Sequence, residues 1–188
     1  VGEIARRVTG QMPGTLLSQL AAGLGADVHF GVPERDLGRC ATVIFDSARS
    51  PARLPPAERA QEADGSEDGA DTERSMLRLG YFNPPGYSSF GVVNTTEWRR
   101  AQVPSTNGHG SAAGLAAFYA GMLEPGRILS AALTAEATRV QSAGDCPVLG
   151  EPAAFGLGFV PTSPRRRFGP NPGAFGHFGT GGAVGFAD

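Results

Sequence analysis

The first 25 residues place apolar positions with the period of amphipathic α-helices. The segment VGEIARRV predicts a helix over residues 1–8, because its apolar positions fall on one side: Val1, Ile4, Ala5 and Val8. Gly10 and Pro13 break this helix. Thr15 is placed to cap a second helix that ends at Gly25 and has its own apolar side: Leu16, Leu17, Leu20, Ala21 and Leu24. We therefore expect a helix hairpin at the start of the chain.

The following stretch predicts two short strands and two long loops. Residues 27–32 and 40–45 are extended candidates, and the second, CATVIF, is the stronger because it is rich in β-branched residues. Residues 50–75 contain three prolines and then seven acidic residues against two arginines, which predicts a flexible, solvated acidic loop. A further loop alternates turn-forming and aromatic residues, which either pack or line a pocket: Tyr81, Phe82, Tyr87 and Phe90.

The remainder predicts two helices and then an antiparallel sheet. Ser111 caps a helix that ends near Gly126 and has apolar residues at i, i+3, i+4 and i+7: Leu115, Phe118, Tyr119 and Met122. A shorter helix follows Ser130. FGLGFV, AFGHFGT and GAVGFA then form three short glycine-rich strands. The predicted fold class is α+β, with helices packed on an antiparallel sheet.

Composition and charge exclude several classes of partner. The chain has 188 residues, which suits one domain, and it is 40% apolar and 18% charged. Its net charge of -2 gives no basic surface for nucleic acid, and no apolar run approaches the ~20 residues of a membrane span. All 16 basic residues are arginine, so mechanisms that need a lysine are excluded within these residues.

The motif search excludes self-contained hydrolase and metal sites. The chain has no G-x-S-x-G nucleophile elbow, and its three histidines lack metal-ligand spacing, so we expect no metal and no cofactor. The glycines of 179–185 do not form a dinucleotide fingerprint, because strand-like residues follow them where a helix is required. Residues 165–167, all arginine, predict a solvated turn. Cys40 and Cys146 have no partner pattern, which favours a reducing compartment, with the cytoplasm as the mild preference.

Three segments together carry a family resemblance. They are NGHGSAAGLAAFYAGML at 107–123, FGLGF at 155–159 and FGHFGTGGAVGFAD at 175–188. In order and spacing they resemble the C-terminal part of the serine β-lactamase and penicillin-binding-protein-like family, in its class C β-lactamase-like and esterase branch. The resemblance implies a β-lactamase/transpeptidase-like fold that is incomplete, with residues 1–188 forming the C-terminal part of one catalytic domain. The first helix lacks a capping residue before it, which also indicates a fragment.

The resemblance assigns roles to six residues. His177-Phe178-Gly179 matches the third family motif, which is Lys-Thr-Gly or His-x-Gly. By resemblance, His177 is catalytic as a hydrogen-bond donor or a pH-dependent charge, and the N–H of Thr180 is one of two oxyanion donors. Phe178 and Gly179 then bind substrate, with Gly179 allowing a close approach of the backbone. The alternative for His177 is a histidine satisfied between strands.

The other two residues of the predicted site are Asn107 and His109. They belong to the turn that, by resemblance, borders the substrate cleft. The alternative is a plain turn at the start of a helix, with His109 exposed.

The implied activity is that of a serine hydrolase. Such an enzyme forms and hydrolyses an acyl-serine intermediate with a small ester, amide or β-lactam substrate. The nucleophile belongs to S-x-x-K, which a chain without lysine cannot contain, so it is expected upstream together with the second-motif tyrosine. Two alternatives remain: a non-catalytic ligand-binding module with the same fold, and an oligomerising structural domain. The sequence indicates neither the oligomeric state nor the particular substrate.

Overall fold

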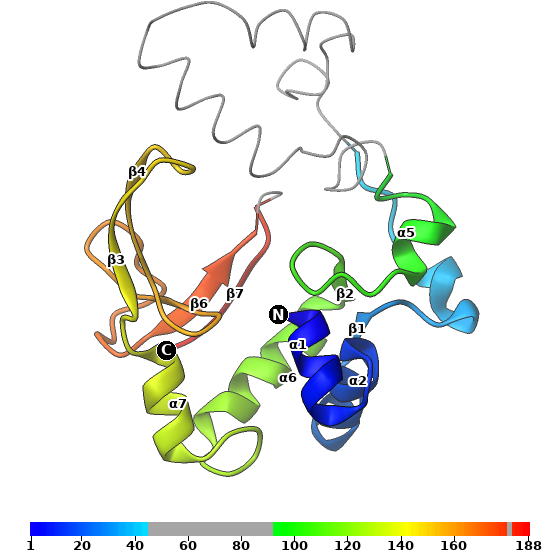
Figure 1. The fold of residues 1–188 in the computed structure, drawn as a ribbon, viewed down its shortest axis with the longest axis horizontal. Helices are drawn as coiled ribbons and strands as arrows, with labels where there is room; N and C mark the ends of the chain where they lie inside the picture. Colours follow the sequence, from blue (N-terminus) through cyan, green and yellow to red (C-terminus); the bar gives the residue numbers. More distant parts are fainter. Residues whose placement is uncertain (45–91, 180–181) are drawn as a thin grey trace, which may run out of the picture. The chain divides into compact units, whose positions relative to one another are not determined.

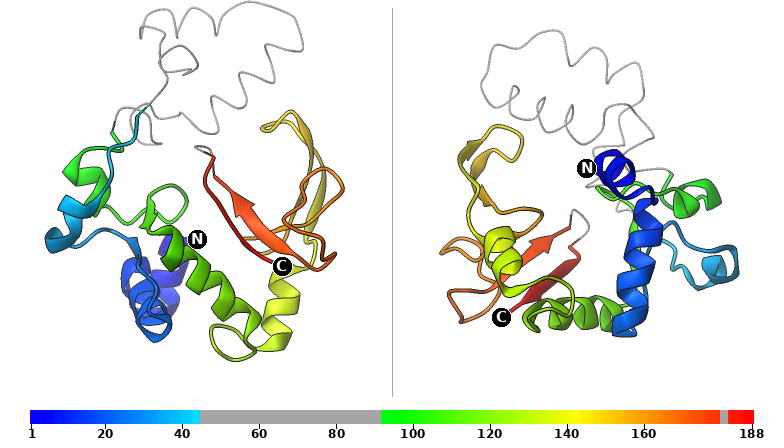
Figure 2. Two further views of the ribbon diagram at one scale, coloured as in Figure 1. Left: turned by 180° about the vertical axis from the view of Figure 1, so that it is seen from behind. Right: turned by 60° about the horizontal axis from the view of Figure 1, so that its bottom comes forward.

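The computed structural model describes residues 1–44, 92–179 and 182–188, drawn in colour in Figures 1 and 2. The chain divides into two units, which we describe separately. Unit 1 comprises Val1–His29, Gly110–Asp145 and Pro152–Asp188, and unit 2 comprises the described residues of Phe30–His109 together with Cys146–Glu151. The predicted acidic loop at 50–75 and the aromatic residues of 81–90 lie outside the described residues. The assignment of the chain to one domain stays a prediction.

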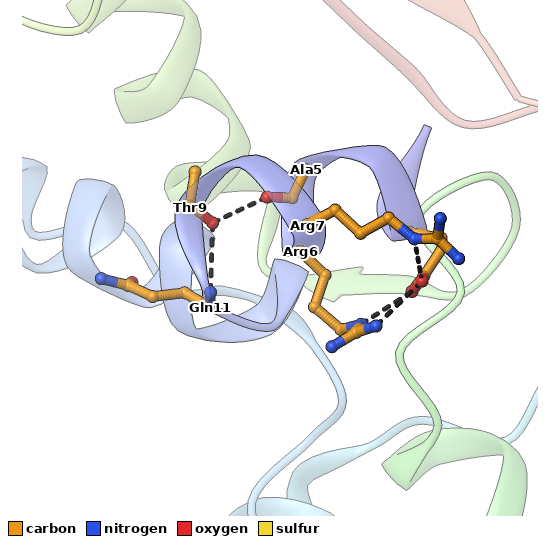
Figure 3. Close-up of polar contacts among 6 residues, drawn as sticks. Ala5, Arg6, Arg7, Thr9 and Gln11 are labelled. Atoms are coloured by element: carbon orange, nitrogen blue, oxygen red, sulfur yellow. Dashed lines mark hydrogen bonds and ion pairs between the residues drawn. The ribbon is translucent and has the colours of Figure 1, made fainter.

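Helix α1 spans Gly2–Thr9 and confirms the first predicted helix. It ends at Gly10, whose φ of 72° is left-handed and favours glycine. Glu3 accepts hydrogen bonds from the guanidinium groups of Arg6 and Arg7, which lie three and four residues along the helix. Figure 3 shows the side chains of both arginines and the dashed lines that mark these bonds. These bonds, first that of Arg6 and then that of Arg7, lower the pKa of Glu3 to about 2.

Helix α2 spans Pro13–Leu24, so the predicted start at Thr15 is wrong. Met12 precedes the helix and Pro13 occupies its first position, where the fixed φ of proline suits a helix and its missing N–H is no loss. The predicted end is confirmed, because Gly25 adopts a left-handed φ of 62°. Helices α1 and α2 are in contact, as the predicted hairpin requires.

Two short strands, β1 (Val28–Phe30) and β2 (Gly108–Gly110), form a two-stranded sheet. Strand β1 lies inside the predicted extended segment 27–32. Strand β2 was not predicted, because Gly-His-Gly has no apolar alternation.

In unit 2, the 3₁₀-helix η1 (Glu34–Arg39) contacts helix α5 (Thr96–Arg100). The predicted strand at 40–45 is wrong over its described residues, 40–44, which form no strand. Instead, the side chain of Asn94 accepts from the N–H of Val43 and donates to its carbonyl, at 2.8 and 2.9 Å. A side-chain amide thus takes the hydrogen bonds that a neighbouring strand would have made.

The two helices predicted in the second half of the chain are confirmed. Helix α6 spans Ala112–Leu123 and is capped by Ser111, whose Oγ accepts from the N–H of Gly114 at 3.0 Å. It ends before Gly126, which lies in the following turn with a φ of 84°. Helix α7 spans Ala131–Thr138 and is capped by Ser130. Among the described helices, none is long and apolar enough to cross a membrane.

Unit 1 ends in an antiparallel sheet, as predicted, in the order β5-β6-β7, with β5 at Val160–Pro161, β6 at Phe175–Phe178 and β7 at Val184–Ala187. The predicted strand FGLGFV is wrong over residues 156–159, which form a turn closed by the N–H of Gly156 on the carbonyl of Phe159, with Gly158 at a left-handed φ of 84°. Helix α6 contacts β7, and the core between them is apolar: Tyr119, Met122, Phe175 and Ala187. A second cluster of buried apolar residues consists of Val160, Phe168 and Ala174. The α+β arrangement of helices on an antiparallel sheet is thereby confirmed.

A hairpin before this sheet was not predicted. Its strands are β3 (Ser142–Cys146) and β4 (Glu151–Phe155), which pair with each other. The turn is closed by the N–H of Gly150, which donates to the carbonyl of Cys146 at 2.8 Å. The sequence of β3, SAGDC, is largely exposed and lacks the alternation by which strands are recognised.

Candidate active site

Strand β6 presents His177 on the sheet face that α6 covers. Side chains alternate along a strand, so His177 shares its face with Phe175, which is buried in the core beside α6. In the register with β7, His177 lies opposite Gly185. His177 is exposed, and its Nδ1 lies 2.8 Å from the carbonyl oxygen of Phe178. The structure therefore leaves this imidazole open to a ligand.

Two glycines allow the sheet to pack closely enough to fix this strand. A Cβ at Gly185 would lie 2.5 Å from the ring of Tyr119, and one at Gly176 would lie 2.3 Å from the carbonyl oxygen of Gly185. Both separations are far below van der Waals contact. Gly176 and Gly185 are thus required by packing, which explains part of the glycine-rich pattern.

Phe178 projects from the opposite face of β6. Its ring stacks on Phe168 with centroids 4.5 Å apart, and the guanidinium of Arg166 lies 5.6 Å from its centroid. The predicted substrate contact of Phe178 is not tested by this packing and stays a prediction. The arginine turn at 165–167, expected to be solvated, has one member that instead covers an aromatic ring.

Gly179 differs from the two packed glycines. A Cβ at this position would lie 3.4 Å from the carbonyl oxygen of Ala183, which is ordinary contact. Its N–H donates to that same oxygen at 2.7 Å, and Gly182 follows with a left-handed φ of 86°. The described residues therefore do not require a glycine at 179. Thr180 lies outside the described residues.

Asn107 lies in unit 2 and is 1% exposed, which makes it the largest fully buried side chain of the described residues. Its Oδ1 accepts from the N–H of Val103 at 2.9 Å, and its Nδ2 donates to the carbonyls of Trp98 and Ala101. These bonds use both of its N–H donors inside the loop. The predicted role of Asn107 in substrate binding would therefore have to be indirect.

His109 follows Asn107 on the same loop and is half-buried. Its Nδ1 lies 2.8 Å from the carbonyl oxygen of Asn107. No hydrogen-bond partner of its Nε2 lies among the residues that the structure describes. The structure thus brings these two predicted residues together through the backbone of one and the side chain of the other.

The turn after His109 is shaped by two glycines that were not predicted to matter. A Cβ at Gly110 would lie 2.8 Å from the carbonyl oxygen of Asp27, and one at Gly114 would lie 2.6 Å from it. Ser111 also donates its N–H to that oxygen at 3.0 Å. The start of α6 therefore rests on the backbone of Asp27, which accounts for the spacing of GHGSAAG.

The side chain of Asp27 makes a further polar contact that the sequence did not indicate. Its Oδ1 lies 3.1 Å from Nε2 of His29, and both side chains are partly buried. Within the described residues, no group of three or more His, Cys, Asp or Glu side chains is suited to hold a metal ion.

The fold and these sites correspond to a known family. A family model described as Beta-lactamase matches residues 1–188, so the chain belongs to the beta-lactamase family. Its helices and antiparallel sheets are those of the β-lactamase/transpeptidase-like fold. No curated protein matches the sequence.

Solved structures narrow the comparison to one branch. The chain is 31% identical, at a TM-score of 0.75, to a novel penicillin-binding protein homologue from Caulobacter crescentus. It is 32% identical, at a TM-score of 0.75, to a family VIII carboxylesterase, and 28% identical, at 0.71, to EstA from Arthrobacter nitroguajacolicus Rue61a. Each match covers 100% of this chain but 46%, 46% and 47% of the other chains. The chain thus spans about half the length of these structures and resembles the esterase and penicillin-binding-protein-like branch.

Proposed function

We propose that the chain is the C-terminal part of a serine hydrolase that acts on small esters, amides or β-lactams through an acyl-serine intermediate. The observation that carries the proposal is the His177-Phe178-Gly179 strand, which belongs to a member of the beta-lactamase family. On this strand the imidazole of His177 is exposed. A Cβ at Gly179 would be in ordinary contact with Ala183, so the packing of the described residues does not require a glycine there. The carboxylesterase among the similar structures favours esters as the substrate class.

In the proposed mechanism, the nucleophile lies upstream of this chain, and residues of this chain contact the substrate. An upstream serine attacks the substrate carbonyl, with the lysine of S-x-x-K in its activation. Negative charge then develops on the carbonyl oxygen, which fixed N–H donors at about 2.7–3.1 Å stabilise. One donor is the N–H of the serine, and the other is the N–H of Thr180. Gly179 lets the substrate approach the backbone. Nδ1 of His177 already faces the carbonyl of Phe178, so His177 donates to the substrate through Nε2 when its ring is protonated, and the protonated ring also supplies a positive charge.

The decisive experiment compares residues 1–188 with the protein encoded by the complete open reading frame. The complete protein is expected to hydrolyse p-nitrophenyl acetate and to be labelled stoichiometrically by a fluorophosphonate, whereas the 188-residue chain does neither. Activity of the short chain would place a nucleophile within it. A complete protein that is folded, unlabelled and inactive would support the non-catalytic binding module instead.

A further inference from the structure

The hydrogen bonds of the three histidines assign their neutral tautomers. A carbonyl or carboxylate oxygen only accepts, so the ring nitrogen facing it must carry the proton. In His109 and His177 that nitrogen is Nδ1, which faces a main-chain carbonyl at 2.8 Å in each case. In His29 it is Nε2, which faces the carboxylate of Asp27 at 3.1 Å. The first two rings therefore expose an unprotonated Nε2, whereas the third does not.

We infer that Asn107 is a positioning residue for His109: it holds the loop in the one shape in which its own carbonyl binds Nδ1. In that shape, Nε2 is presented as an acceptor for an N–H or O–H group of a bound substrate. This use of Nε2 rests on the proposed function, whereas the tautomer and its dependence on Asn107 do not.

The dependence follows from how the carbonyl is held. Gly108 and His109 belong to β2, which pairs with β1, whereas Asn107 lies just before this strand. The pairing therefore holds the residue that carries the ring but does not by itself hold the carbonyl of Asn107. The side-chain amide of Asn107 is bonded to three backbone groups, that of Trp98 in α5 and those of Ala101 and Val103. These bonds add to the one that its own N–H donates to the carbonyl of Val103, and they tie the residue to α5. Loss of the amide releases the loop and with it the acceptor of Nδ1. The imidazole then returns toward the tautomer mixture of a solvated histidine.

The tautomer assignment is tested by nitrogen NMR of the complete protein with isotope-labelled histidine rings. At a pH where the spectrum itself shows neutral rings, His109 is expected in the Nδ1–H form and His29 in the Nε2–H form. The variants His109→Gln and His29→Gln assign the two signals. Finding His109 in the Nε2–H form would overturn the inference without any further variant.

The dependence of the His109 tautomer on Asn107 is tested by comparing two asparagines whose side chains both bond to loop backbone. Asn107→Ala is expected to shift His109 away from the Nδ1–H form, whereas Asn94→Ala, which frees the backbone of Val43, is expected to leave it unchanged. His177 serves as an internal control, because its acceptor belongs to β6. If Asn107→Ala does not fold, Asn107→Ser removes the amide bonds and leaves a small hydroxyl, which buries no charge against the carbonyls of Trp98 and Ala101. An unchanged His109 in a folded variant at 107 contradicts the inference.

A double-mutant cycle tests whether Asn107 acts on the reaction through His109. In the complete protein, His109→Gln and Asn107→Ala should each lower kcat/KM for an ester substrate several-fold, and the double variant should be no worse than His109→Gln. Asn94→Ala should instead leave kcat/KM unchanged in either background. Additive losses at 107 and 109 would contradict positioning through the ring. A complete protein without any hydrolase activity would refute the proposed function while leaving the tautomer result to stand.

Discussion

Strand β6 and the loop before β2 each present a histidine whose Nδ1 faces a main-chain carbonyl at 2.8 Å, but they are held by opposite means. Strand β6 is fixed by close packing, in which Gly176 lets it approach β7 and Gly185 lets β7 approach α6. The loop is held by the buried side-chain amide of Asn107, with two backbone N–H groups that donate to the carbonyl of Val103. Packing spreads stability over many contacts, whereas a buried amide concentrates it in one residue. The two regions should therefore respond differently to substitution.

The comparison is sharpest between two glycines of the same segment. Gly176 has no room for a Cβ, since one would lie 2.3 Å from the oxygen of Gly185, whereas a Cβ at Gly179 would be in ordinary contact. We expect Gly176→Ala to lower the free energy of unfolding of the complete protein by about 3 kcal/mol, because the strands must separate. Gly179→Ala should change it by less than about 1 kcal/mol. Urea denaturation measures both values.

These two alanine variants are matched in chemistry and differ only in their surroundings. Equal losses at 176 and 179 would show that the packing of β6 against β7 does not distinguish the two positions. A stable Gly176→Ala variant would mean that the sheet separates at little cost.

The next largest effect concerns the proposed reaction. His177→Ala should lower kcat/KM of the complete protein by ~10²-fold, which is the range for losing a proton-transfer group or an electrostatic stabiliser. Gly179→Val should be at least as damaging, because its side chain would intrude on the space proposed for the oxyanion. Steady-state kinetics with an ester, together with urea denaturation of each variant, measure these effects. Two folded, fully active variants would remove β6 from the proposed site.

The parts of the fold that the sequence predicts correctly are those set by neighbouring residues. Ser111 and Ser130 cap helices, and Gly10 and Gly25 end them, because a cap needs only the next turn of the chain. The one cap predicted wrongly is Thr15, where a proline two residues earlier competes as the helix start.

The wrong predictions concern segments whose structure depends on residues distant in the sequence. Residues 40–44 have the composition of a strand, but side chains more than 50 residues away bond to their backbone instead. Asn94 bonds to both backbone groups of Val43, and Arg99 donates to the carbonyl of Ala41. The same holds for the site. The motif containing His177 identifies an exposed strand position, whereas the burial of Asn107 depends on a loop that folds back onto its amide. A polar residue gives no sign in the sequence that it will be buried.

A smaller effect is expected from the amide that holds the loop. Asn107→Ala leaves the carbonyl of Ala101 and the N–H of Val103 without the amide, whereas the carbonyl of Trp98 keeps its bond from the N–H of Ala101. The loss should lower the free energy of unfolding by about 2 kcal/mol. Asn94→Ala also removes two backbone contacts, but Asn94 is exposed and water can replace it. Its cost should be below about 1 kcal/mol. Similar losses for the two variants would show that burial of the amide adds nothing.

The smallest effect comes from α1, where polar contacts are made at the surface. Arg6 and Arg7 lower the pKa of Glu3 to about 2 from an ordinary 4.5, so the ionised form is favoured in the folded state. The resulting stabilisation is fully present above pH 4.5 and is lost as the pH falls toward 2. Because Glu3 and Arg6 are each about half exposed, salt should weaken it.

Comparison of the wild-type protein with Glu3→Gln measures this contribution. The difference in their free energies of unfolding should be small and constant above pH 4.5, and it should shrink between pH 4.5 and 2. Added salt should reduce it at neutral pH, whereas the loss caused by Asn107→Ala should not respond to salt, because that amide is buried and uncharged. A difference that is independent of both pH and salt would show that Glu3 acts through helix propensity rather than through its charge.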